Sequence, residues 1–288
     1  MNKYRKQHIL PKAYLKYFSK DNSGKGIYVL KLSSKSEKAE IKNQGDSIFW
    51  KKDFYTENRF EDKYIIEKSF GIVESKYHSI VDSLKKQESL INQEVRFGLI
   101  WWIALSKIRS PKIRDDYERK EKFFTQISEI LPSAYNTQSQ QVKEHFSRFA
   151  KQYHLDYFLD NDLFNKTFSE IASCLLTKQW IILIAPESIK FWTSDNPGFS
   201  VYSDEYEEKG FITPDPSLNK LTIDSHHFYP LTKDYCLECA PHEKGSVINS
   251  NLNDEIVSYK HINHAICAEI NRFTALTAND LIITDRQE

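Results

Sequence analysis

A run of apolar residues at positions 99–105 (LIWWIAL) places the strongest constraint on the fold. It lies inside a segment, residues 92–109, that is predicted to form one α-helix and to end before Pro111. A helix without a polar face is normally central and buried. The most apolar stretch, residues 97–108, is shorter than the roughly 20 residues that span a bilayer. We therefore expect a buried helix that the other elements cover.

A second helix is predicted over residues 60–84. Apolar side chains recur there at alternating spacings of four and three, which forms one stripe along a helix. The stripe consists of Ile66, Phe70, Val73, Tyr77, Ile80 and Leu84. Glu67 and Glu74 flank it seven residues apart and share a face. Residues 112–176 are expected to add a helical insertion.

The hydrophobic period changes after residue 176, where short runs of strand-forming residues begin. We expect a buried hairpin that delivers the turn at residues 194–198, and a long loop over about 203–225. Further strands are predicted at 27–30, 49–50, 227–231, 235–239 and 281–283, and a last helix at 253–273. The expected fold is α+β and predominantly helical. It is a single domain over residues 1–288, with a small, mostly antiparallel sheet formed by N-terminal and C-terminal strands.

The charge balance limits the classes of partner. The chain has 40 Lys and Arg against 40 Asp and Glu, so the net charge is zero. Proteins that coat nucleic acid non-specifically usually show a basic excess, which argues against that class. Residues 1–59, however, hold fourteen basic residues against six acidic ones. This basic segment can steer an anion such as a nucleotide or nucleic acid, or it can be an ordinary solvated surface.

The thiols and the first residues bear on the compartment. Four Cys all follow residue 170, and their spacing is not that of a small disulfide scaffold. Residues 1–6 are polar, and no apolar run with a small-residue cleavage site follows them. We expect a cytoplasmic protein with reduced thiols and no membrane segment.

Two short motifs can carry chemistry. Asp195, Asn196 and Pro197 directly follow a predicted strand. They form either a capped turn or a carboxylate held at a sheet end for a substrate or divalent metal. His8 precedes a helix that Pro11 starts, and it is either a satisfied structural residue or a base and metal ligand.

Other patterns point to different chemistry. Cys236, Cys239 and His242 have zinc-like spacing, as do His261, His264 and Cys267. Cys236 and Cys239 lie three apart in a predicted strand and so on opposite faces, which argues against a zinc site. Arg148 and His154 have a spacing similar to the Arg/His pair of the helical ribonucleases called HEPN proteins, although such pairs often occur by chance. The sequence has no phosphate-binding glycine loop, nucleophile elbow or dinucleotide fingerprint.

The motifs together resemble a bacterial family known as domain of unknown function 4238. Residues 7–18 fit its QHxxPxxYLxxF opening, and residues 193–197 match its TSDNP motif. Residues 52–55, 108–111 and 228–231 fit three further segments, while Glu74 and Asn263 fit single positions in helices. The resemblance covers nearly the whole chain except residues 115–165 and 203–225.

The resemblance supplies candidate residues and no reaction. It implies one pocket in which the two end motifs meet. His8, Asp195, Arg109 and Gln7 are then candidate catalytic residues, and Ser194, Asn196 and Asn263 are candidate substrate contacts. Glu74, Asp195 and His8 are the candidate ligands for Mg²⁺ or Mn²⁺.

Two functions remain open on this basis. The first is a metal-dependent hydrolase, a nuclease or nucleotide hydrolase, in phage defence or as a toxin. The alternative is a non-enzymatic module that binds a ligand or a protein, with both motifs structural.

Overall fold

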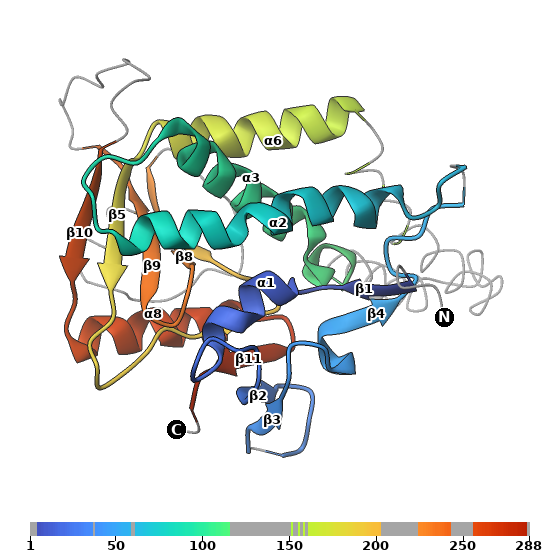
Figure 1. The fold of residues 1–288 in the computed structure, drawn as a ribbon, viewed down its shortest axis with the longest axis horizontal. Coiled ribbons are helices and arrows are strands. Elements are labelled where there is room, and N and C mark those ends of the chain that lie inside the picture. Colours follow the sequence, from blue (N-terminus) through green and yellow to red (C-terminus); the bar gives the residue numbers. More distant parts are fainter. Residues whose placement is uncertain are drawn as a thin grey trace, which may run out of the picture.

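The two long helices predicted from the apolar pattern pack against each other in the computed structural model (Figure 1). The structure describes residues 5–36, 38–58, 61–115, 151, 155, 158, 161–202, 224–242 and 256–286, with only the backbone at 161–164 and 202. Helix α2 spans Ile65–Lys85 and α3 spans Gln93–Arg109, where the Asn92 side chain accepts a hydrogen bond from the Val95 amide at 2.9 Å. Such a cap satisfies one free donor of the first helical turn.

Helix α3 is buried along most of its length, as its apolar composition predicts. Leu99, Ile100, Ile103 and Ala104 are fully buried, because α2 and helix α6 (Asn161–Leu176) contact α3. Phe97 and Trp101 are exposed, at 44% and 37%, and the Trp101 ring lies tilted against that of Phe168 in α6 with the ring centres 4.0 Å apart. No helix in the described ranges is both long and apolar enough to cross a membrane.

A five-stranded sheet lies beside these helices, in the order β10-β5-β9-β8-β7 (Figure 1). The strands are β5 (Gln179–Ile184), β7 (Phe199–Tyr202), β8 (Ser225–Pro230), β9 (Tyr235–Ala240) and β10 (Val257–His261). All neighbours are antiparallel except β10 and β5. One apolar cluster joins this sheet to α2 and α3, and a second joins it to helix α8 (His264–Thr277).

Two smaller sheets complete the described fold. A four-stranded sheet has the order β3-β2-β11-β6, and a two-stranded ribbon pairs β1 with β4. Their strands are β1 (Lys6–His8), β2 (Ile27–Lys31), β3 (Glu40–Lys42), β4 (Trp50–Lys52), β6 (Thr193–Ser194) and β11 (Leu281–Thr284). Helix α1 (Lys12–Leu15) and two 3₁₀ turns, Lys16–Phe18 and Ser47–Phe49, lie between strands of these sheets.

The predicted fold class is wrong. The chain does not form a mainly helical structure with one small sheet, because it has sheets of two, four and five strands in the described part alone. The expected hairpin does not form: β5 pairs with β9 and β10, and β6 pairs with β11. Residues 257–261 form a strand, so the last helix begins at His264. These pairings join residues far apart in sequence, which local periodicity does not report.

Other predictions fall partly outside the described residues. Most of the expected helical insertion at 112–176 lies there, although α6 forms its C-terminal part. Most of the expected loop at 203–225 also lies there, as does the Arg148 and His154 pair. The single-domain prediction remains a prediction.

A buried aromatic group joins α1, α2 and α3 to the sheets. The Tyr14 hydroxyl donates to the Pro230 carbonyl at 2.6 Å and lies 2.7 Å from the Thr193 hydroxyl. The Tyr14 ring also lies against the rings of Tyr77 and Trp102. The segment that carries His8 is therefore fixed against both larger sheets.

Candidate functional site

Gln7 is a structural residue of the β1–β4 ribbon. It is fully buried, and its Nε2 donates to the Thr56 hydroxyl at 3.0 Å. Its Oε1 accepts from the backbone amide of Tyr55. Because both ends of the side-chain amide are already bonded, Gln7 fixes the 53–56 turn against β1 and is not free to contact a substrate.

Arg109 connects three elements from the end of α3. Its Nη1 donates to Glu74 Oε1 in α2 at 2.7 Å, and its Nη2 donates to the backbone carbonyl of His8 in β1. The guanidinium is 3% exposed and lies 4.3 Å from the centre of the Phe70 ring. The predicted neighbours His8, Glu74 and Arg109 therefore do come together. They form a buried ion pair that fixes the ribbon to the helices.

The groups around this ion pair have opposite pKa shifts. Burial, with the charges of Lys12 and Arg109, lowers the pKa of His8 to about 4. Burial raises the pKa of Glu67 to about 7; the charge of Arg109 lowers this pKa and the charge of Glu74 raises it. At neutral pH the imidazole is uncharged and the carboxyl is partly protonated. Within the described residues, His8 Nε2 and Glu67 Oε2 are buried and have no hydrogen-bond partner. Opposite shifts of this kind are found at acid–base sites.

Asp195 holds the turn between α8 and β11. Its carboxylate accepts backbone hydrogen bonds from Asn279 at 2.9 Å and from Asp280 at 3.0 and 3.1 Å. The residue is 2% exposed, and burial raises its pKa although these amides oppose the shift. The amides occupy both carboxylate oxygens, so the geometry supports the capped-turn interpretation.

The residues beside Asp195 are also bonded to the backbone. The Ser194 hydroxyl accepts from the Asn196 amide at 3.2 Å, and Asn196 Nδ2 donates to the Thr277 carbonyl at 2.8 Å. Gly198 follows with a φ of +81°, and a Cβ there would lie 2.6 Å from the Tyr229 ring. Only glycine fits both the conformation and the space.

Asn263 is a helix cap, and a different asparagine lies in the core. Asn263 Oδ1 accepts from the Ile266 amide at 3.0 Å at the start of α8. Asn271, which the sequence reasoning missed, accepts from the Trp192 amide and donates to the Lys190 carbonyl, both at 2.8 Å. The feature of the sequence that could have indicated Asn271 is its position as a polar residue between Ile270 and Phe273, on the buried side of α8.

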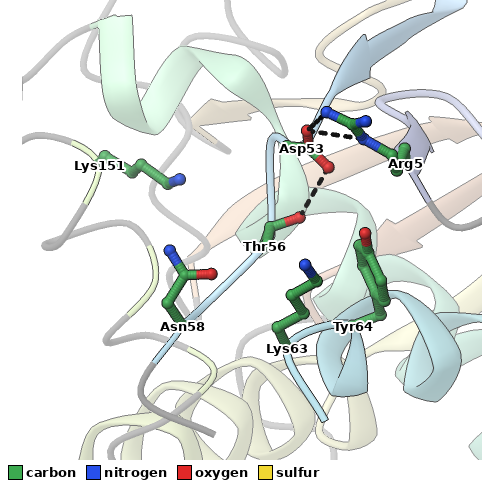
Figure 2. Close-up of a pocket in the computed structure, with 7 residues that line it drawn as sticks. All are labelled: Arg5, Asp53, Thr56, Asn58, Lys63, Tyr64 and Lys151. Atoms are coloured by element: carbon green, nitrogen blue, oxygen red, sulfur yellow. Dashed lines mark hydrogen bonds and ion pairs between the residues drawn. The ribbon is translucent and has the colours of Figure 1, made fainter.

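A cavity of about 330 Å³ opens at the end of the ribbon (Figure 2). Three basic residues, one acidic residue and three uncharged polar residues line it: Arg5, Lys63 and Lys151, then Asp53, then Thr56, Asn58 and Tyr64. Arg5 bonds Asp53 at 3.0 Å, whereas Lys63 and Lys151 form no ion pair with any carboxylate in the described residues. Figure 2 shows the three cationic side chains around one hollow, brought from separate segments of the chain. Of these three cations, only Arg5 belongs to a feature that the sequence indicated, the basic segment 1–59.

The family model described as "Protein of unknown function (DUF4238)" matches residues 6–288. The chain belongs to this family. The resemblance drawn from the two end motifs is thereby confirmed. No curated protein and no solved structure matches the chain.

The proposed metal ligands of this DUF4238 chain do not form one group. Among the described residues, which include His8, Glu74 and Asp195, no three His, Cys, Asp or Glu side chains are arranged to bind a metal ion. The two motifs instead meet directly at the hydroxyls of Tyr14 and Thr193, 2.7 Å apart, and Ser110 adds a second link by donating its hydroxyl to the Asp195 carbonyl at 3.2 Å. The Mg²⁺ or Mn²⁺ cofactor stays a prediction.

The thiols behave as the strand pattern predicts. Cys236 packs in the cluster beneath α8 and Cys239 in the cluster beneath α2 and α3, so they lie on opposite faces of β9. All four cysteines, each among the described residues, are buried, and none forms a disulfide. A joint zinc site for Cys236 and Cys239 is incompatible with this placement.

Replacing Glu67 tests the raised carboxyl pKa. The pKa of Glu67 in the folded protein is about 7, above the ordinary value near 4.5. Its contribution to the free energy of unfolding is therefore complete below about pH 4.5 and declines as the pH rises through 7. Glu67→Gln stays neutral, so its stability relative to wild type should rise over this interval. Urea unfolding at several pH values measures the difference. A difference that does not change with pH would contradict the raised pKa.

Replacing Asp195 tests the role of its carboxylate in the turn. Asp195→Asn turns one acceptor oxygen into a donor that faces a backbone N–H group, and should lower the free energy of unfolding by about 1–3 kcal/mol. The matched control is Asp82→Asn, whose carboxylate is exposed and pairs only with the exposed Lys85. This control should change stability by less than about 0.5 kcal/mol. Equal stability of both variants would refute the structural role.

Proposed function

We propose that the chain is a ligand-binding module that takes up a phosphorylated ligand of the nucleotide class in the cavity of Figure 2. One observation carries this proposal: Arg5, Lys63 and Lys151 converge on a single hollow from three parts of the chain. It is the second of the two functions expected from the sequence, with the QHxxP and TSDNP motifs in structural roles.

The charge in the cavity suits a phosphate group. Asp53 is the one carboxylate on the wall, and the hydrogen bond from Arg5 keeps its pKa below the ordinary value. The remaining charges of Lys63 and Lys151 leave an excess of two positives, which matches a phosphate dianion. Lys151 already has a pKa lowered by burial and by the nearby charge of Arg114. A bound anion would favour the charged form of Lys151 and so oppose this lowering of its pKa.

The size and lining of the cavity favour more than a bare phosphate. A volume near 330 Å³ is at the lower end of small-molecule sites, which start at roughly 300 Å³. The amide of Asn58 can donate to phosphate or sugar oxygens, whereas the Thr56 hydroxyl already accepts from Gln7 and donates to Asp53. The ring of Tyr64 adds an apolar surface for a sugar or base.

Hydrolysis is the second candidate, and the opposite pKa shifts of His8 and Glu67 favour it. A neutral imidazole can accept a proton from an attacking water, and a carboxyl with a pKa near 7 can donate one to a leaving group. Arg5 of the cavity directly precedes β1, which carries His8, and Lys63 of the cavity precedes α2, which carries Glu67.

Calorimetric titration with ATP and pyrophosphate tests the binding proposal. Each charged hydrogen bond to phosphate contributes about 1.5–3 kcal/mol, so Lys63→Gln and Lys151→Gln should each weaken binding about tenfold or more. The matched control is Lys25→Gln, an exposed lysine in the turn before β2 and outside the cavity lining. It should bind as wild type does. Failure of the wild type to bind either ligand, or unchanged affinity in both cavity variants, would overturn the proposal.

Product formation tests the hydrolytic candidate separately. Wild type incubated with ATP, RNA or DNA should release products if the chain is a hydrolase, with Mg²⁺ or Mn²⁺ supplied in parallel samples. His8→Ala should abolish the release, because the variant lacks the neutral imidazole that accepts the proton of the attacking water. Binding without product in every sample would eliminate hydrolysis and leave the binding proposal intact.

A further inference from the structure

The β1–β4 ribbon connects the cavity of Figure 2 to a second, larger cavity. The first cavity includes Arg5 and Asp53, which flank the ribbon at one end. The second, of about 520 Å³, includes Ile9 and Trp50 at the other end. Trp50 and Asp53 are three residues apart, or about 10 Å in extended chain. One elongated ligand can therefore reach both cavities.

The ribbon between the cavities carries unneutralised positive charge. Lys6 and Lys52 are directly opposite each other in the antiparallel register. Like charges in this position destabilise a strand pair. Both side chains are exposed, and neither forms an ion pair with a carboxylate in the described residues. A polyanion lying along the ribbon would relieve this repulsion.

Trp50 supplies an aromatic surface beside these lysines. It lines the second cavity, and the Lys6 ammonium lies 4.8 Å from the centre of its ring. The same cavity holds Ser33 and Ser47, which can bond the edge of a base. It also holds Asp115, Asp195 and Asp280, so a base and not a phosphate suits this end; Asp280 pairs with Lys31, and backbone amides bond the Asp195 carboxylate. Alternating cations and an aromatic ring are the arrangement by which grooves bind single strands: cations contact phosphates, and bases stack on rings.

From this arrangement we infer that the ligand is a single-stranded nucleic acid, which runs along β1–β4 with a phosphate in the first cavity and a base against Trp50 in the second. The inference rests on the proposed function and specifies its ligand. A mononucleotide would use only one cavity and leave Lys6 and Lys52 unneutralised. A duplex keeps its bases stacked on one another and offers none to Trp50.

Fluorescence anisotropy with labelled oligothymidylate and oligouridylate of about 12 nucleotides, within the range that single-strand grooves cover, tests this inference. Either strand should bind more tightly than ATP or a duplex of the same length. Trp50→Ala should weaken binding of the strand by about 5- to 150-fold and leave ATP affinity unchanged. Trp50→Phe keeps a ring and should recover much of the loss.

The salt dependence of binding provides a second measurement, and the variants that it uses leave the buried core unchanged. Each phosphate contact contributes about 0.7 to the slope of log affinity against log salt for a single strand. Lys6→Gln with Lys52→Gln should therefore reduce the slope by about 1.4, whereas Lys25→Gln should not change it. Both variants remove only exposed charges, so a loss of fold would not explain the result.

Three results would overturn the inference. The first is equal affinity for the strand and ATP, and the second is no effect of Trp50→Ala together with an unchanged salt slope. The third is equal binding of poly-glutamate, which would show a general polyanion surface. In each case ATP binding that still depends on Lys63 and Lys151 would leave the proposed function standing. Failure of every phosphorylated ligand to bind would refute both.

Discussion

The buried guanidinium of Arg109 is the interaction on which the N-terminal half of the fold depends. It joins the end of α3 to the middle of α2 through Glu74, and to the backbone of β1 through the His8 carbonyl. A buried charge without its partner costs about 3–5 kcal/mol, so Arg109 strongly favours the arrangement in which these three elements are packed together. The same arrangement explains the unusual titration of its neighbours, since the helices that enclose the ion pair also remove water from His8 and Glu67.

A short series of hydrogen bonds connects the two family motifs. Ser110 follows Arg109 and bonds the backbone of Asp195, which in turn holds the amides of Asn279 and Asp280. A motif near the start of the chain thus supports the same junction as one near its end. The lysines of the cavity and the exposed lysines of the ribbon take no part in these hydrogen bonds, so substitutions of Lys63, Lys6 or Lys52 leave the junction intact.

Local patterns in the sequence predicted the parts of the fold that local forces determine. The apolar stripe of α2, the Asn92 region at the start of α3 and the strands around residues 228 and 237 all formed where expected. The parallel contact of β10 with β5 and the pairing of β6 with β11 were missed, because each joins segments more than 70 residues apart. The cavity was missed for the same reason: Arg5, Lys63 and Lys151 are neighbours only after folding.

The position of β11 has a consequence for how the chain is made. This strand is formed by residues 281–284, yet it lies between β2 and β6 and pairs with both. Synthesis on the ribosome proceeds from the N-terminus, so β2 emerges long before its partner exists. The edges of β2 and β6 that pair with β11 stay open until residues 281–284 have left the exit tunnel. A chain that stops before residue 281 would therefore keep two open strand edges, the kind of surface from which aggregation starts.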